Sequence, residues 1–419
     1  MKNREIGHIR LMRPIRLVGL AGLVWLAGLV GLSSCSSEQQ EPEKQKVTVE
    51  ANPCSTAFEE AAIAGTRAWL PPTGFTTIAG MEGKSIGICF TRDGEEPKKG
   101  YFVYSSNKWL TSVEEIETKS YYLYGYIPHQ GGVSCDISSS STPGDNSSYS
   151  TGAVLTIKNL PTITSNDVCV LVGATNGFGK GYSTDPAVDY SITGLKPGDF
   201  EYEAKATSVD PPSTGNCVFL LFDHLYSSMC VRFKVHPDYN ALRTIKLKKL
   251  SLKTRTEDEY TKKYTDITIT LNKTLDGSSP IAKDGLGKEL ITYTQSGEIE
   301  NDGTLFESTN GQTLTTSYST FQGNFMPHGI TKLIITSTYD VYDKDTSQKP
   351  EGNLIRKDCV AENTLMFSKL NFEDAGGNLF LQSEARRGMR YTINITIKPT
   401  YLYVMSDPDL VNPDFVVDE

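Results

Sequence analysis

Apolar and polar residues alternate with a period of two along much of the chain. The alternation is strongest in residues 391–398, where one Tyr and three Ile residues alternate with Thr, Asn and Lys. Residues 86–91 and 267–271 repeat the pattern, with Ile, Phe or Leu at every second position. Such alternation predicts strands that bury one face. Because runs with a helical period are scarce, the sequence predicts an all-β fold.

Further short apolar runs, separated by polar loops, predict more strands of this kind. They lie at residues 101–104, 121–127, 154–160, 168–172, 217–224, 229–235 and 333–335. Between residues 245 and 252 the alternation slips by one position at Lys248-Lys249, which predicts a β-bulge. Nearer the N-terminus, residues 47–49 are a short strand candidate, and residues 59–65 fit a helical turn or a connector.

The length of 419 residues allows two domains of ordinary size. Residues 207–216 are polar and contain Pro211-Pro212, the composition of a linker. Many short strands on each side of this linker would bury their inner faces most simply as two packed sheets. We therefore expect one β-sandwich over residues 68–213 and a second over residues 214–397.

The first 35 residues carry the features of an export signal. Five basic residues precede an apolar run at 17–32, which is too short and wrongly flanked for an ordinary membrane span. The run ends in Leu32-Ser33-Ser34-Cys35, which resembles a bacterial lipobox. The resemblance implies cleavage between Ser34 and Cys35, loss of residues 1–34, and acylation of Cys35 with chains such as palmitate. Several acyl chains anchor a protein stably. The alternative is a plain secretory signal with an incidental Cys.

A second candidate processing site follows this signal. Residues 36–46 are polar and charged and contain Pro, which is typical of a flexible leash. Arg67 then lies between small residues in a predicted loop, where chains are readily nicked by proteases. Cleavage between Arg67 and Ala68 would make residues 35–67 a removable propeptide. The alternative is a solvated Arg ahead of a strand.

Charge and motifs exclude several functions. A net charge of −9 and a pI near 5.3 argue against nucleic acid as a main partner. The chain has no GxSxG, HExxH or CxxC motif, and the glycine-rich residues 173–181 lack the features of a phosphate-binding loop. We expect no enzyme activity, no catalytic residues, no cofactor and no bound metal. The Asp residues within 340–345 and 407–414 leave calcium as an alternative to ordinary solvated turns.

Cysteine and aromatic residues are interpreted as core. Eight Cys occur, so an odd number remains after Cys35 and they cannot all pair. Four of them lie inside apolar runs, where Cys acts as a small core residue: Cys89, Cys169, Cys217 and Cys230. The Tyr- and Trp-rich first half also reads as core, with a glycan-binding platform as the alternative.

The tail at residues 398–419 exceeds what the preceding strand needs. It contains two apolar segments, residues 401–405 and 415–417, on either side of a polar run that favours a turn. We interpret the tail as strand intended for another molecule.

Taken in order, these features resemble the fimbrillin superfamily of Bacteroidales pilins. The resemblance rests on the lipobox at Cys35, residues 66–68, Trp109 with residues 122–128, Phe222-Asp223-His224, and the ending at residues 391–404. It covers nearly the whole mature chain. It implies two transthyretin-like antiparallel β-sandwich domains in tandem.

The resemblance also implies a processing route. The precursor would be a lipoprotein of the cell outer membrane and the product a fimbrium on the cell surface. A trypsin-like, Arg-directed protease would cut after Arg67 and remove residues 35–67, including the strand at 47–49. A strand from a neighbouring subunit would fill the groove. The tail would supply this donor strand through Tyr401, Leu402, Tyr403, Val404, Phe415 and Val417.

An Arg site together with a donor-like tail favours a stalk subunit whose partners are other pilin subunits. The alternatives are a tip adhesin, or a monomeric surface lipoprotein that binds a glycan or a host protein. Pro408 and Pro413 depart from an ideal donor strand because they interrupt backbone pairing.

Overall fold

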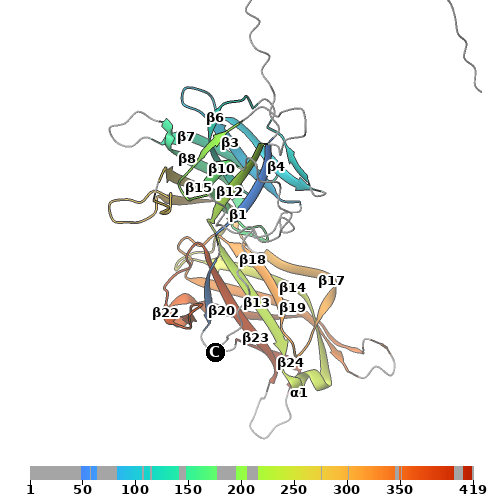
Figure 1. Ribbon diagram of the computed structural model, residues 1–419. Helices are drawn as coiled ribbons and strands as arrows, with labels where there is room; N and C mark the ends of the chain where they lie inside the picture. The colour runs from blue at the N-terminus through green and yellow to red at the C-terminus, as the bar shows by residue number, and fades with distance from the viewer. Residues whose placement is uncertain are drawn as a thin grey trace, which may run out of the picture. The chain divides into compact units, whose positions relative to one another are not determined.

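The computed structural model is drawn in Figure 1. It describes residues 49–56, 58–63, 83–105, 108–113, 116–140, 148–176, 195–204, 216–274, 276–300, 302–344, 349–350, 352–400 and 409–417. These residues form strands β1 to β24 and one short α-helix, α1 (Pro237–Leu242). The prediction of an all-β fold is confirmed.

Two of the four sheets pack against each other through a shared apolar core. Sheet A has the order β1-β12-β10-β6-β3-β4-β5, with β11 paired to β6, and sheet C has the order β16-β15-β8-β7. Tyr124 and Val170 of sheet A meet Leu155 and Ile267 of sheet C in one buried cluster. The strands of sheet A are β1 (Val49–Ser55), β3 (Ser85–Thr91), β4 (Lys98–Ser105), β5 (Lys108–Thr111), β6 (Ser120–Ile127), β10 (Cys169–Asn176), β11 (Glu201–Glu203) and β12 (Asn216–His224). Those of sheet C are β7 (Ser134–Ser140), β8 (Ser148–Pro161), β15 (Lys262–Asn272) and β16 (Ile291–Ile299).

The other two sheets are related in the same way. Sheet B has the order β22-β21-β2-β23-β13-β18-β9, with β24 paired to β23, and sheet D has the order β17-β14-β19-β20. Val231 and Ile393 of sheet B and Leu250 and Ile335 of sheet D are buried together. The strands of sheet B are β2 (Glu59–Ile63), β9 (Ile163–Thr164), β13 (Ser227–Val235), β18 (Ser319–Phe325), β21 (Asn371–Glu373), β22 (Leu379–Leu381), β23 (Met389–Thr400) and β24 (Asp409–Val417). Those of sheet D are β14 (Arg243–Arg255), β17 (Gly303–Leu314), β19 (Lys332–Asp343) and β20 (Leu354–Met366).

The expected division at residues 213 and 214 does not follow the sheets. Strand β12 pairs with β10 and β1 in sheet A, and β15 and β16 join β8 in sheet C, although all three lie beyond residue 213. Conversely, β2 and β9 lie before residue 213 and belong to sheet B. Sheet pairing is non-local here, so a linker-like composition does not mark where one sheet ends. Most pairs are antiparallel, but β1–β12, β2–β23 and β13–β23 are parallel.

Several strand predictions are confirmed in detail. The slip at Lys248-Lys249 is a bulge, because the pairing of β14 with both β17 and β19 shifts between Leu247 and Lys249. The residues at 86–91 form β3, and those at 267–271 lie in β15.

Two strand predictions need correction. Residues 59–65 were expected to form a helical turn or connector, but Glu59–Ile63 is β2, held by neighbours on both sides. Glu and Ala have weak intrinsic preference for strands, so this pairing overrides local propensity. Strand β23 was expected to be half-buried, but its polar face is buried as well, at Arg390, Thr392, Asn394 and Thr396. The first strand candidate, residues 47–49, lies largely outside the described residues, and β1 runs from Val49 to Ser55.

The core interpretation of Cys and Tyr residues fits the structure where it is described. Cys89, Cys169 and Cys230 are buried with free thiols. Tyr101 of β4 is 38% exposed and Tyr122 of β6 is partly buried. Tyr124 is fully buried, and four more Tyr residues of sheet A are at most 5% exposed: Tyr104, Tyr121, Tyr126 and Tyr202. These aromatic side chains are therefore unavailable as a glycan-binding platform.

The Asp residues within 340–345, considered above as calcium ligands, contact other protein groups where the structure describes them. Asp340 is buried and accepts a 2.7 Å hydrogen bond from the Asp358 backbone N–H. The Asp343 carboxylate lies 3.5 Å from the Arg243 guanidinium. Asp345 lies outside the described residues.

Candidate functional site

The segment at residues 49–63, here called the N-terminal segment, contributes a strand to each of two sheets. Its first strand, β1, lies at the edge of sheet A and pairs in parallel with β12, from Val49 opposite Asn216 to Ser55 opposite Phe222 (Figure 1). Its second strand, β2, lies inside sheet B between β23 and β21. One short stretch of chain therefore completes two sheets.

The side chains of this segment belong to the cores of both sheets. Ala51 has no exposed surface and joins the core on the face of sheet A that points away from sheet C. Ala61 is equally buried, in the core shared with sheets B and D. Small residues at these positions let the segment lie close to its neighbours. Between the strands, Thr56 N–H donates to the Phe222 carbonyl at 2.9 Å and Glu59 N–H to the Gly388 carbonyl at 2.8 Å.

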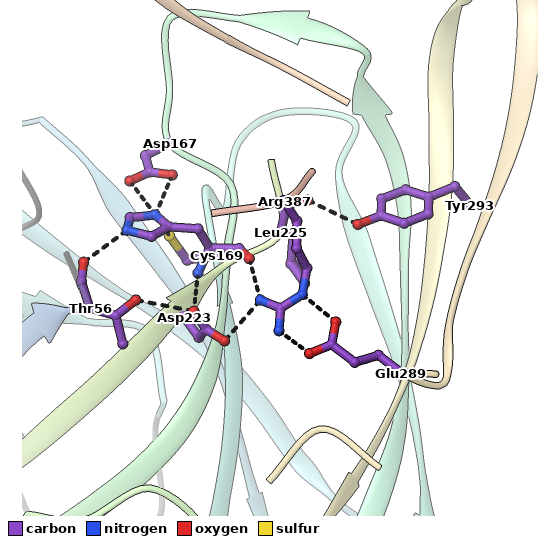
Figure 2. A network of polar contacts seen from close by, with 9 residues as sticks. Thr56, Asp167, Cys169, Asp223, Leu225, Glu289, Tyr293 and Arg387 are labelled. Atoms are coloured by element: carbon purple, nitrogen blue, oxygen red, sulfur yellow. Dashed lines mark hydrogen bonds and ion pairs between the residues drawn. The ribbon is translucent and has the colours of Figure 1, made fainter. Parts of the chain in front are cut away.

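His224, at the end of β12, contacts the link between β1 and β2 through its imidazole ring. Its Nε2 lies 2.8 Å from the Thr56 carbonyl oxygen, and its Nδ1 lies 3.0 Å from each Asp167 carboxylate oxygen (Figure 2). The Phe58 ring stacks on the imidazole, with ring centres 3.7 Å apart and planes 16° from parallel. The His224 side chain is only 1% exposed.

The protonation state of His224 follows from this geometry. Both ring nitrogens face oxygen acceptors, and only the imidazolium form can donate from both. Burial, the largest influence, lowers the pKa of His224, but Asp167 and the Thr56 carbonyl oppose it and the pKa is raised overall. The environment therefore favours the charged form of the ring, in which both of its hydrogen bonds are charge-assisted.

Asp223, next to His224, extends the network in the other direction. It accepts a 3.1 Å hydrogen bond from the Thr56 hydroxyl and a 2.9 Å hydrogen bond from Nη1 of Arg387. The same Nη1 donates to the His224 carbonyl at 2.9 Å. Arg387 also makes a two-pronged ion pair with Glu289, with Nε 2.6 Å from Oε2 (Figure 2). The turn before β23 is thus tied to the end of β12.

A buried ion pair fixes β2 in sheet B. Arg390, opposite Glu60 in the β2–β23 register, is 1% exposed. Its Nε donates to Oε1 of Glu60 at 2.7 Å, and its Nη2 contacts the same oxygen. A charge this deeply buried is tolerated only when it is paired and hydrogen-bonded.

Asp167, Cys169 and His224 also bring three metal-ligand atoms within 4.8 Å of one another. The 3.0 Å contacts between His224 and Asp167 are those of a hydrogen-bonded ion pair. The pKa of the Cys169 thiol is raised well above its usual value, chiefly by burial, and this disfavours the thiolate. Only the thiolate form of Cys is a good metal ligand. The cluster therefore fits a role in binding the N-terminal segment better than a role in binding an ion.

The predicted site residues are described only in part. Phe415 and Val417 lie in β24, which pairs antiparallel with β23 of its own chain, Phe415 opposite Ile397 and Val417 opposite Ile395. Phe415 is buried and its ring lies 4.6 Å from that of Tyr339. The tail was expected to be surplus to its own domain, but this part of it completes sheet B. Eight predicted site residues lie outside the described residues: Ser34, Cys35, Arg67, Ala68, Tyr401, Leu402, Tyr403 and Val404.

Sequence reasoning missed β2 and the contacts of His224. The signal present in the sequence is Asp223-His224 at the end of an apolar strand, which the family resemblance includes without assigning it a contact. Its partners Asp167 and Thr56 are 57 and 168 residues away in the chain. Among the described residues no helix has the length and apolar character needed to cross a membrane.

Comparisons with known proteins give likeness to solved structures alone. No protein-family model and no curated protein matches the chain. A Bacteroides uniformis protein assigned to cell adhesion is 12% identical, with 86% of this chain and 97% of that chain covered and a TM-score of 0.31. A Bacteroides fragilis protein with the same assignment is 10% identical, with 88% and 97% covered and a TM-score of 0.32.

A third similar structure is the fimbrial anchor protein Mfa2 from Porphyromonas gingivalis. It is 13% identical, with 88% of this chain and 94% of that chain covered and a TM-score of 0.25. The chain is thus similar to these three proteins along most of its length, at low identity.

Proposed function

We propose that this protein is the precursor of a stalk subunit of a surface fimbrium, assembled by strand exchange after proteolysis. It would be exported to the outer membrane as a lipoprotein acylated at Cys35 and cut by a trypsin-like protease between Arg67 and Ala68. The observation that carries this proposal is the double role of the N-terminal segment. Both of its strands lie just before Arg67, so a single cut would detach β1 and β2 together.

The physical consequence of losing the segment supports polymerisation. Strand β12 would become an unpaired edge, and the facing sides of β21 and β23 would lose their partner. Buried positions now filled by Ala51, Phe58 and Ala61 would open to water. Unpaired backbone beside apolar surface is a template for an added strand. A neighbouring copy of this chain, through its tail, would be the donor.

The donor must first leave its own sheet. Strand β24 is stored on β23, where Asn363 donates a 2.7 Å hydrogen bond to the Phe415 carbonyl. Release of β24 therefore costs its pairing and the burial of Phe415, and docking on a neighbour must offset that cost. This requirement supports exchange that is coupled to removal of the N-terminal segment, because only then is a better site open.

The test uses the full chain made without lipid by replacing Cys35 with Ser. An Arg-specific protease should give a product that begins at Ala68 and forms filaments, seen by electron microscopy and light scattering. The Arg67→Gln variant should stay monomeric, whereas the matched variant Arg92→Gln should assemble normally. Deletion of residues 398–419 should also abolish filaments. Equal assembly by Arg67→Gln, or by the deletion variant, would refute the proposal.

A further inference from the structure

Cys89 of β3 points from sheet A towards sheet C. In the same strand, Ile88 and Phe90 bury the opposite face, in the core on the side of sheet A that points away from sheet C. Successive side chains of a strand alternate, so Cys89 shares its face with Gly87. A Cβ placed on Gly87 would lie 2.2 Å from the ring of Tyr126, which belongs to the core shared by sheets A and C. Cys89 is 2% exposed in this position.

Cys135 of β7 approaches it from sheet C. Its side chain is 9% exposed and joins the core between the two sheets, and its ladder partner Ile157 is fully buried in the same core. The Cys135 thiol lies 3.4 Å from the Asp136 carbonyl oxygen and within hydrogen-bonding reach of the Cys89 sulfur. The two sulfur atoms therefore meet across the space between the sheets.

Lys99 of β4 holds the two strands together at this point. It lies opposite Cys89 in the β3–β4 ladder, and its Nζ donates a 3.0 Å hydrogen bond to the Cys135 carbonyl. The pKa of Cys89 is lowered, chiefly by its hydrogen bond with Cys135 and also by the Lys99 charge, against the effect of burial. The thiolate is the form of Cys that attacks a disulfide. Cys89 is therefore the better nucleophile of the two.

The other Cys residues whose side chains the structure describes have different surroundings. Cys169 has its sulfur 3.5 Å from Nδ1 of His224. Cys230 lies on β13 in sheet B and Cys359 on β20 in sheet D. The pair in sheets A and C also belongs to a chain with a predicted export signal, and disulfides form and persist in exported proteins.

From this geometry we propose that Cys89 and Cys135 form a disulfide that joins sheet A covalently to sheet C. A disulfide requires two neighbouring Cys side chains that point towards each other, as these two do. The bridge closes the loop of chain between residues 89 and 135, and closing a long loop stabilises a fold by restricting the unfolded chain. The two sheets would stay joined even when β1 is absent from the edge of sheet A.

The bond forms by exchange with a small disulfide, for which oxidised glutathione serves as the oxidant. The Cys89 thiolate attacks one sulfur of the oxidant, and a mixed disulfide forms as one glutathione thiolate leaves. The Cys135 thiolate then attacks the Cys89 sulfur and expels the second glutathione thiolate. The two protons lost by the cysteines end on the two glutathione thiols, and the pair of electrons passes to glutathione. Because both sulfurs are buried in the folded chain, this exchange takes place while sheets A and C come together.

The test starts from the full chain with Cys35→Ser, reduced, unfolded and refolded with or without oxidised glutathione. The oxidised monomer, unfolded and alkylated, should take up two fewer alkyl groups than the reduced monomer, as measured by mass spectrometry. Proteolytic mapping without reductant should yield a linked peptide pair that contains residues 89 and 135. Uptake equal to that of the reduced chain, bound glutathione alone, or a link that excludes residue 89 or 135 would overturn the proposal.

Variants and stability give a second measurement. The urea midpoint of the oxidised chain should fall when dithiothreitol is added, and Cys135→Ser should remove this response. Cys359→Ser is the matched control, because Cys359 is also 9% exposed and lies in sheet D, and it should keep the response. A midpoint of the unsubstituted chain that ignores dithiothreitol would contradict the bridge. If Cys135→Ser does not fold, the peptide map of the unsubstituted Cys pair still decides the question.

This proposal stands apart from strand exchange. Both measurements use the unprocessed monomer and need neither cleavage nor filaments. A missing disulfide would therefore leave the proposed assembly untouched, and a failure to form filaments would leave the disulfide untouched.

Discussion

At the scale of single residues, His224 makes the most varied contacts with the N-terminal segment. The Asp167 carboxylate contacts one nitrogen of its ring, the Thr56 carbonyl contacts the other, and the Phe58 ring stacks on its face. Asp167, Asp223 and the Cys169 thiol are the titratable groups around it. Because the imidazolium is the form that satisfies both acceptors, this contact is coupled to pH.

We predict that the stabilisation contributed by His224 declines as pH rises. Its pKa is raised in the folded chain, so the contribution is complete below the unfolded value near 6.5 and is lost as pH passes through the higher folded value. Urea unfolding of the full chain and of His224→Gln, from pH 5 to 9, should show a difference in unfolding free energy that shrinks with rising pH. The variant His236→Gln, at a more exposed His, is the control. A difference that stays constant or grows with pH would contradict the assignment.

A second residue-scale prediction concerns the buried ion pair of β2. Glu60→Gln removes the charge that faces the buried Arg390 guanidinium, and breaking such a pair costs about 3 kcal/mol. Glu59→Gln, one position away on an exposed side chain, should change the free energy of unfolding by less than about 0.5 kcal/mol. Denaturant titration of both variants measures the contrast. Equal effects would mean that the Glu60 contact adds nothing specific.

At the scale of elements, the β21–β22 hairpin depends on β2. Strand β22 pairs with β21, and the other ladder of β21 is made with β2. Among the described strands, β2 is therefore what joins the backbone of this hairpin to the rest of sheet B. Side-chain packing remains, because Phe372 is buried with its ring centre 5.5 Å from that of Tyr391.

We expect the hairpin to loosen when β2 is absent. In a chain that begins at Ala68, hydrogen exchange at residues 371–381 should become faster than in the full chain. Strands β13 and β18, which pair with each other away from β2, should exchange at nearly unchanged rates. Unchanged protection of residues 371–381 would show that packing of Phe372 alone holds the hairpin.

Strand β24 gives a second prediction at this scale. Phe415→Ala should destabilise the monomer by about 3 kcal/mol, because the ring is buried beside Tyr339 and Phe233. Val416→Ala, at a neighbouring exposed position, should cost less than about 0.5 kcal/mol. Thermal and denaturant unfolding of the unprocessed chain would measure both. Loss of stability in neither variant would mean that β24 is only loosely stored.

At the scale of the whole molecule, the N-terminal segment matters because two sheets share it. A chain that begins at Ala68 should therefore unfold at a lower denaturant midpoint than the full chain. A peptide of residues 49–63 added in excess should restore much of the difference, since a ligand that binds only the folded state stabilises it. A truncated chain as stable as the full one would show that neither strand contributes to the global fold.

The sequence predicted the class of fold but not its connections. Alternation identified β3, β15 and β23, and the slip at Lys248-Lys249 identified a bulge, because these are local patterns. Sheet membership is not local: the hairpin of β15 and β16 interrupts the strands of sheet D and pairs in sheet C. For the same reason the candidate site could not be assembled from sequence, since Thr56 and His224 meet only after folding.

The position of β24 has a consequence for which strand edges a filament would expose at its end. Strands β2 and β24 approach each other along one side of β23, with Ala62 opposite Thr392 and Val417 opposite Ile395. If exchange proceeds as proposed, every copy that donates β24 uncovers residues 395–400 of its own β23. The copy at the end of the filament donates nothing and keeps that edge covered. That end of the filament would then expose no unpaired β23 edge until its own β24 is released.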